Sequence, residues 1–146
     1  MLGPELNSCL KDLFEKRIST VILATTDINH RPHTAPFNYV IAQDAKHLRI
    51  AISKEHQTYR NISERSPVAL EVLEEGDVAV CIKGLAKVIR DNMCADYNMA
   101  VIEIEILEIK KDNSPNYLVT QGIRARHKNE LTLFNSRKLL HELSEV

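Results

Sequence analysis

Apolar and polar residues alternate over four segments of this chain, and this pattern constrains its fold more than any other feature. The segments are 47–52, 68–73, 78–90 and 99–111. A period of two is that of a β-strand with one face turned inward. Most of these segments are separated by short turn sequences such as Glu-Glu-Gly-Asp at 74–77, and strands joined by tight turns pair antiparallel. We therefore predict a largely antiparallel sheet of about six strands.

Two further strands are expected before these. Residues 20–26 are apolar and β-branched on both faces, which predicts a strand covered on each side. Residues 31–42 continue as a long strand with Ala35, Phe37, Tyr39 and Ile41 on one face. Pro32 and Pro36 cannot donate to a ladder, so this strand should lie at an edge or kink away from its neighbour. The interruption would leave backbone groups free to meet a ligand, beside the polar side chains of His33, Thr34 and Asn38.

Two irregularities mark the later strands. Gly84 interrupts the inward face of 78–90, where a barrel could bend sharply or another group approach closely. Near Ile106 the alternation shifts by one residue, so that Leu107 and Ile109 take over the apolar face. A bulge or twist at this point would explain the shift.

Three helices are predicted around the sheet. Residues 4–17 carry leucines at helical spacing, with Pro4 in the first turn and Lys16 and Arg17 in the last. A second helix follows the strand at 47–52 after a tight turn, with Ser53 as its N-cap. A third is capped by Asn135 or Ser136 and runs through Leu139, Leu140 and Leu143. The helices would cover the ends and side of a closed or partly closed barrel.

Composition limits the possible partners. The 146 residues suit one domain, 1–146, and the 19 basic and 20 acidic residues form no block of like charge. We therefore expect no nucleic-acid partner and no membrane anchor. The early part of the chain is acidic and lacks a long apolar run, so we predict a cytoplasmic protein.

The cysteines also indicate a reducing compartment. Cys9, Cys81 and Cys94 are odd in number and far apart, which predicts free thiols. Cys81 sits in an apolar run and is expected to be a small core residue.

The start of the second helix carries a candidate phosphate site. A helix N-terminus offers unpaired N–H groups and partial positive charge, and Lys54 or Arg60 could add charge. The side chains that would supply further donors are Ser53, Gln57, Thr58 and Asn61. The alternative is an ordinary capped, solvated helix.

The sequence does not indicate a metal site, a nucleotide-binding loop or a set of catalytic side chains. The six histidines show no metal-ligand spacing, and no glycine-rich nucleotide motif is present. No carboxylate pair or nucleophilic triad can be argued from residue order, so we predict no metal site and assign no catalytic residue.

Three segments together resemble the pyridoxamine 5'-phosphate oxidase-like family of FMN-binding split barrels. They are VILATTDINHRPHTAPFNYVI at 21–41, HLRIAISKEHQTYRNISERSPVALEVLE at 47–74 and VCIKGLAKVI at 80–89. The resemblance implies a mainly β fold: a split antiparallel barrel of about six strands in Greek-key order, with flanking helices. It also implies a homodimer with FMN in clefts at the subunit interface.

The resemblance further implies two groups of cofactor-binding residues. Those beside the flavin ring would be Thr34, Ala35, Pro36 and Asn38, and those at the phosphate would be Ser53, Gln57, Thr58 and Asn61. Many relatives have lysine just before the threonine. Gln57 stands there in this chain and brings no charge to the phosphate.

The implied activity is that of an FMN-dependent oxidoreductase acting on a small organic substrate. The alternatives are a flavin carrier or redox sensor with little turnover, or a split barrel that binds haem or deazaflavin. Residues 120–127 hold two arginines and a histidine that could reach a cleft, or they form a solvated surface turn. The substrate and the electron donor cannot be derived from these residues.

Overall fold

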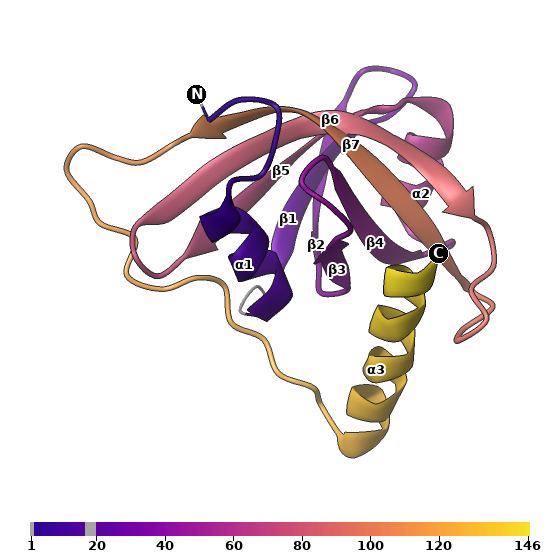
Figure 1. The fold of residues 1–146 in the computed structure, drawn as a ribbon. Helices are drawn as coiled ribbons and strands as arrows, with labels where there is room; N and C mark the ends of the chain where they lie inside the picture. The colour runs from indigo at the N-terminus through magenta and orange to yellow at the C-terminus, as the bar shows by residue number, and fades with distance from the viewer. Residues whose placement is uncertain (1, 17–19) are drawn as a thin grey trace.

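The computed structural model describes residues 2–16 and 20–146 and contains seven strands and three helices (Figure 1). In chain order these elements are α1 Ser8–Lys16, β1 Val21–Thr26, β2 Pro32–Phe37, β3 Val40–Ala42, β4 His47–Ser53, α2 Gln57–Glu64, β5 Pro67–Glu74, β6 Val78–Arg90, β7 Met99–Lys111 and α3 Glu130–Glu145.

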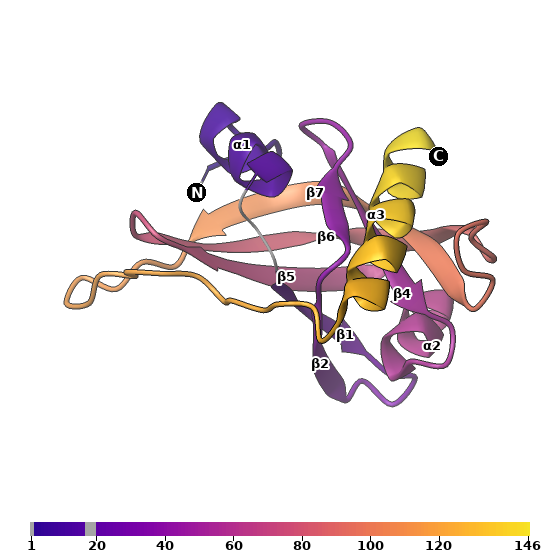
Figure 2. The same cartoon turned by 90° about the horizontal axis from the view of Figure 1, so that it is seen from below.

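All seven strands belong to one curled antiparallel sheet. Its order is β2-β1-β5-β6-β7-β4-β3. The long strands β6 and β7 arch across the molecule, with α1 under one end and α3 under the other (Figure 1). Turned by 90°, the molecule shows α2 beside β1 and β2 (Figure 2). This arrangement confirms the prediction of a mainly β, antiparallel fold with flanking helices.

The predicted strand at 31–42 is in fact two strands, which raises the number from about six to seven. β2 ends at Phe37 and β3 begins at Val40, and the two lie at opposite edges of the sheet. Among the described strands β2 pairs with β1 alone, which confirms the edge position that Pro32 and Pro36 require. The break also changes the alternation, because Val40 is buried where a continuous strand would have buried Tyr39.

The concave side of the sheet encloses the main apolar core. The predicted inward positions on β5 and most of those on β6 are buried, as are the leucines of α1. The largest fully buried side chains include Leu13, Leu23, Leu48, Ile50, Ile82, Ile102 and Ile109. A smaller cluster lies under α3 and contains Ala51, Met93, Val101, Leu139 and Leu143.

Gly84 on β6 lies at the β-bulge between β6 and β7. A Cβ atom on Gly84 would lie 2.3 Å from the backbone oxygen of Glu105 on β7. The register between β6 and β7 shifts between Lys83 and Gly84, which confirms both the close approach and the bulge. The prediction for Leu107 was wrong, because Leu107 sits in the bulge and is 48% exposed while Ile106 and Ile109 are buried.

The outer helices begin elsewhere than predicted. Residues 2 and 3 bond to Ile109 of β7, and the N–H of Leu6 donates to the backbone oxygen of Ala45, so the chain is not helical at Pro4. α1 begins after Asn7, whose side chain accepts the N–H of Leu10 at 2.8 Å. The predicted end at Arg17 lies outside the described residues. α3 begins a turn and a half before the predicted caps Asn135 and Ser136, because Asn129 accepts the N–H of Thr132. Within the described ranges, no helix is long and apolar enough to cross a membrane.

Candidate functional site

The first turn of α2 is capped by His56, not by the predicted Ser53. The ladder between β4 and β7 continues as far as Ser53, which pairs with Met99. Residues 54–56 then form a turn in which the hydroxyl of Ser53 accepts the N–H of Glu55. The Nδ1 atom of His56 accepts the N–H of Thr58 at 3.2 Å. Strand pairing therefore moves the helix start three residues along the chain.

His56 joins α2 to β2. Its ring centroid lies 5.3 Å from that of Phe37 and 6.0 Å from that of His33. Accepting at Nδ1 requires an uncharged imidazole. Burial lowers the pKa of His56, and the neighbouring His33 and Arg60 lower it further. The two groups of residues expected to bind the cofactor, one on β2 and one on α2, therefore lie on adjoining elements.

A chain of hydrogen bonds runs from the surface of α2 to its buried side and ties the helix to β1. The Nε2 atom of Gln57 donates to Oδ1 of Asn61 at 2.7 Å, and Nδ2 of Asn61 donates to Oγ1 of Thr25 at 3.0 Å. Arg60 donates to Oε1 of Gln57 at 3.1 Å and brings positive charge to this group. Gln57 and Asn61 thus share one side of the helix, as their spacing predicts.

Thr58 differs from its neighbours. It is fully buried at 0% exposure, and its hydroxyl has no hydrogen-bond partner among the described residues. The Nε2 atom of His33 on β2 is also buried and has no hydrogen-bond partner within the part of the chain that the structure describes. The Nε atom of Arg65 is a third such atom among the described residues. Buried polar groups are nearly always satisfied, so the Thr58 hydroxyl is a candidate contact for a bound group.

The residues expected beside a flavin ring divide between two faces of β2. Ala35 is buried in the core, whereas Thr34 and Pro36 are exposed on the outer face of the sheet. Asn38 follows the strand and accepts a hydrogen bond from the hydroxyl of Thr20 at 2.8 Å. Since Ile22 pairs with Pro36 and Ala24 with Thr34, the outer face continues onto β1 with apolar side chains.

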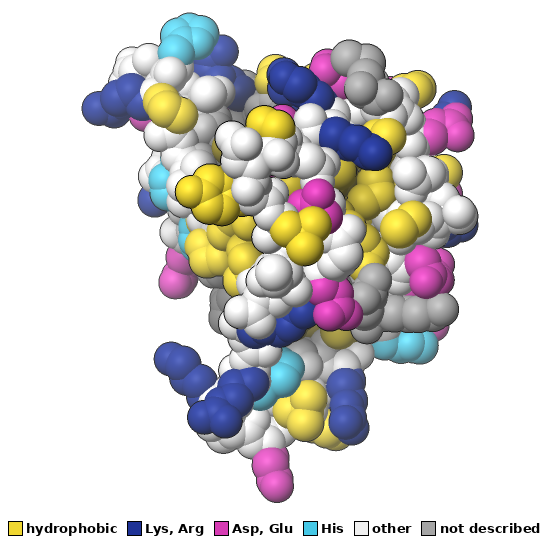
Figure 3. Space-filling view, turned by 90° about the vertical axis from the view of Figure 1, so that its left-hand side faces the viewer, with side chains coloured by type: hydrophobic (Ala, Val, Ile, Leu, Met, Phe, Trp, Pro, Cys, Tyr) yellow, Lys and Arg dark blue, Asp and Glu magenta, His cyan; other side chains and the backbone are white. Residues whose placement is uncertain are grey.

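The segment 120–127 is fixed at two points. Arg124 forms an ion pair with the buried Glu74, and the Nε2 atom of His127 lies 3.2 Å from Oγ of Ser136 on α3. Beside the contact of His127 with Ser136, a cavity of about 250 Å³ is lined by these two residues, Asn38 and Arg126 among others. Basic side chains also gather where α3 begins, at the lower end of the molecule in Figure 3. The segment therefore reaches one of the residues expected to bind the cofactor.

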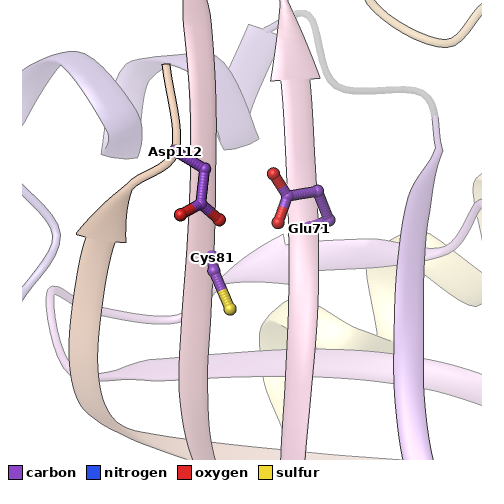
Figure 4. Close-up of side chains that lie close together, drawn as sticks. All are labelled: Glu71, Cys81 and Asp112. Carbon is purple, nitrogen blue, oxygen red and sulfur yellow. The ribbon is translucent and has the colours of Figure 1, made fainter. Parts of the chain in front are cut away.

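The sequence did not predict a cluster of Glu71, Cys81 and Asp112 on the outer face of the sheet. Cys81 was expected in the core, but it is half-buried on the outer side of β6, because the inward positions are those of Val80 and Ile82. Its thiol lies beside the carboxyl groups of Glu71 and Asp112 (Figure 4). Glu71 pairs directly with Cys81 across the ladder, so only the register brings them together. All three cysteines are free, as predicted.

Comparisons with known proteins agree with this architecture. The sequence profile described as pyridoxamine 5'-phosphate oxidase matches residues 8–121. The chain resembles the crystal structure of a putative pyridoxamine 5'-phosphate oxidase from Lactobacillus delbrueckii with 26% identity and a TM-score of 0.63, covering 73% of this chain and 94% of that one. No curated protein matches the chain.

Two more distant structures share the fold. An F420 reductase has 19% identity and a TM-score of 0.60, over 73% of this chain and all of that one (100%). An FMN-binding protein from Syntrophomonas wolfei has 17% identity and a TM-score of 0.54, over 71% of this chain and 88% of that one. The profile covers most of the chain, from α1 to beyond β7, and includes both β2 and α2. This chain therefore belongs to the pyridoxamine 5'-phosphate oxidase-like family of split barrels.

Proposed function

We propose that this protein binds FMN at the junction of β2 and α2 and uses it to oxidise or reduce a small organic substrate. The observation that carries the proposal is the buried hydroxyl of Thr58 in the first turn of α2, which finds no hydrogen-bond partner in residues 2–16 and 20–146. A phosphate supplies acceptor oxygens, and the start of a helix favours negative charge. Family membership and the likeness to an FMN-binding protein support the choice of cofactor.

The phosphate group would be held by Ser53, Gln57, Thr58 and Asn61. Gln57 contributes no charge, so the nearest cation on α2 is Arg60, which already bonds to Gln57. Lys54 is directed elsewhere, since its ammonium bonds to Asn92 and lies 5.6 Å from the ring centroid of Tyr97. Phosphate binding in this chain therefore depends on neutral donors and on Arg60 more than on lysine.

The ring would lie along β2, with Thr34, Ala35, Pro36 and Asn38 providing contacts from side chains and backbone. Bound FMN supplies the hydride chemistry, and the protein supplies position and electrostatics. Arg126 and His127 line the cavity next to Asn38, which makes that cavity the candidate place for a substrate. No side chain is assigned to the chemical step.

A homodimer would complete the cofactor cleft. The outer face of the sheet carries an apolar groove of about 460 Å³, lined by Ala24, Pro32, Pro67, Ala69, Leu85 and Leu107 among others. Thr34 and Pro36 project from this same face. A second copy packed over the groove would bury its apolar surface and enclose a ring lying on β2. Sedimentation at micromolar concentration should show a dimer, and a monomer would exclude this arrangement.

An absorption spectrum of the purified protein, followed by titration with FMN, tests the cofactor. Flavin bands, or quenching of FMN fluorescence with a clear end point, would support the proposal. Haem or deazaflavin bands would show that the same fold binds one of those cofactors instead of FMN. If the protein is colourless and quenches no FMN fluorescence, the proposal is wrong. A protein that binds FMN but turns over no donor and acceptor pair would be a carrier or sensor.

A further inference from the structure

The Glu71–Cys81–Asp112 cluster lies away from the junction of β2 and α2 and is not used by the proposed function. Its three potential ligand atoms, two carboxylate oxygens and one sulfur, lie within 4.8 Å of one another. Figure 4 shows the three side chains close together on β5, β6 and the residue after β7, with the carboxyl groups of Glu71 and Asp112 facing one another. The cluster combines two kinds of donor from three separate segments of the chain.

The backbone holds these segments in place. Glu71 and Cys81 are direct partners in the ladder between β5 and β6, so their side chains share the outer face. The N–H of Asp112 donates to the backbone oxygen of Ala79 at 2.8 Å, which fixes Asp112 against the same part of β6. Glu71 and Cys81 are half-buried, whereas Asp112 is exposed and leaves the cluster open to solvent. The donors are therefore preorganised and accessible.

Acidic groups outnumber basic ones around the thiol. Glu71, Asp112 and Glu108 lie near Cys81 on this face, and Lys110 and Lys83, which pair with Cys81 and Glu108 across the ladder, offset part of their charge. The carboxyl groups of Glu71 and Asp112 also repel one another when both are ionised. A bound divalent cation would remove the repulsion and hold the sulfur as a thiolate, with its proton released to solvent.

We propose that Glu71, Cys81 and Asp112 form a binding site for a zinc ion. Zinc accepts sulfur and oxygen ligands together, whereas magnesium and calcium prefer oxygen alone. Tetrahedral zinc with bonds of about 2.0–2.3 Å separates its ligands by about 3.3–3.8 Å. Ligand atoms within 4.8 Å need only small side-chain rotations to reach that spacing. Three protein ligands leave the fourth position to water.

The experiment measures zinc binding by the purified full chain with any flavin left in place. We expect about one zinc ion per chain by elemental analysis after equilibrium dialysis, with magnesium failing to compete. Cobalt used as a probe should give a near-ultraviolet thiolate charge-transfer band. Cys81→Ala should abolish the band and weaken zinc at least tenfold, whereas Cys94→Ala, which removes an exposed thiol elsewhere, should change neither.

The Glu71→Gln variant measures the contribution of the carboxylate independently of the thiol, because it leaves Cys81 unchanged. This variant should weaken zinc while cobalt, at saturating concentration, still gives the thiolate band. Circular dichroism of each variant checks that the fold is intact. If zinc binds equally well to the Cys81→Ala protein, the metal is held elsewhere, for example by exposed histidines, and the proposal fails. It also fails if the unmodified protein retains no zinc, and neither result bears on FMN binding.

Discussion

The carboxylate of Glu74 and the guanidinium of Arg124, which is fifty residues further along the chain, form an ion pair at 2.6 Å. Glu74 ends β5 and is 1% exposed, while Arg124 is half-exposed. Next to this pair Gly122 passes so close to β5 that a Cβ atom would lie 2.3 Å from the backbone oxygen of Leu73. These contacts hold the segment after β7 against β5, so 120–127 is not a free surface turn.

Replacing Arg124 with glutamine should therefore destabilise the protein. The change leaves a buried carboxylate without its counter-charge, and we expect a loss of about 2 kcal/mol in the free energy of unfolding, measured by urea denaturation near neutral pH. Arg126→Gln is the matched control, because Arg126 lines a cavity instead of pairing with Glu74, and should change stability by less than about 0.5 kcal/mol.

The pH dependence of stability gives a second measure of this pair. The hydrogen bond from Arg124 holds the pKa of Glu74 below its usual 4.5. A lowered pKa in the folded state adds stability above the unfolded value, and this stability is lost as pH falls through the folded value. The Arg124→Gln protein should lose less stability than the unmodified protein over this acid range. If the free energy of unfolding depends on pH in the same way in both proteins, the Glu74–Arg124 pair contributes nothing to the pH dependence of stability.

Gly84→Ala should be among the most damaging single-methyl additions in the sheet. The new Cβ atom would meet backbone oxygen of Glu105 at 2.3 Å and Cγ2 of Ile104 at 2.8 Å, so β6 and β7 would have to separate at the bulge. We expect a loss of about 2–3 kcal/mol by urea denaturation. Lys83→Ala, at the adjacent exposed position, should cost far less, and equal effects would mean that the sheet relaxes freely here.

Leu85→Asp tests the proposed dimer. Leu85 lines the apolar groove on the outer face, and a charge there would be buried against a second copy. Sedimentation should show a monomer at micromolar concentration, with FMN affinity falling in parallel. Leu131→Asp, at a 67% exposed leucine on α3, is the control and should remain dimeric. An unaffected dimer in the Leu85→Asp protein would place the interface on another surface.

Local patterns predicted the parts of the fold that depend on local chemistry. Two prolines placed β2 at an edge, and Gly84 marked the close approach to β7, because each constraint lies in the residue itself. The cap of α2 depended on a distant element: pairing of Ser53 with Met99 extended β4 and left His56 as the cap. Strand alternation also could not show that β3 crosses to the opposite edge from β2.

The candidate site shows the same limit. The spacing of Gln57 and Asn61 predicted their shared side of the helix, which their hydrogen bond confirms. Contacts between segments distant in sequence depend on register and chain path, so the ion pair of Glu74 with Arg124 and the contact of Glu71 with Cys81 had no local signal. The role of the site residues in cofactor binding stays a prediction.

Gln57→Lys should strengthen FMN binding if the phosphate lies at the start of α2. A lysine adds charge beside the phosphate, and charge-assisted hydrogen bonds are about twice as strong as neutral ones, so we expect a gain of about 1 kcal/mol in binding free energy. The gain should shrink at high salt, because exposed charges are screened. Arg60→Gln removes charge at the same place and should have the opposite effect on the fluorescence titration. Unchanged affinity in both variants would place the phosphate elsewhere.

Thr58→Val separates a ligand-binding role from a structural one. The substitution keeps the shape of the side chain and removes a buried hydroxyl that has no partner among the described residues. The apoprotein should therefore be as stable as the unmodified apoprotein, or more stable by up to about 1 kcal/mol. FMN should bind about fivefold more weakly, because the phosphate loses a donor, which corresponds to about 1 kcal/mol.

Thr25→Val is the matched control for Thr58→Val, since the Thr25 hydroxyl accepts a hydrogen bond from Asn61. Its removal leaves a buried amide donor unpaired and should destabilise the apoprotein by about 1 kcal/mol or more. Urea denaturation of the apoproteins and fluorescence titration with FMN measure the two effects separately. If Thr58→Val lowers stability as much as Thr25→Val and leaves FMN affinity unchanged, the Thr58 hydroxyl serves the fold, and the phosphate binds at another place.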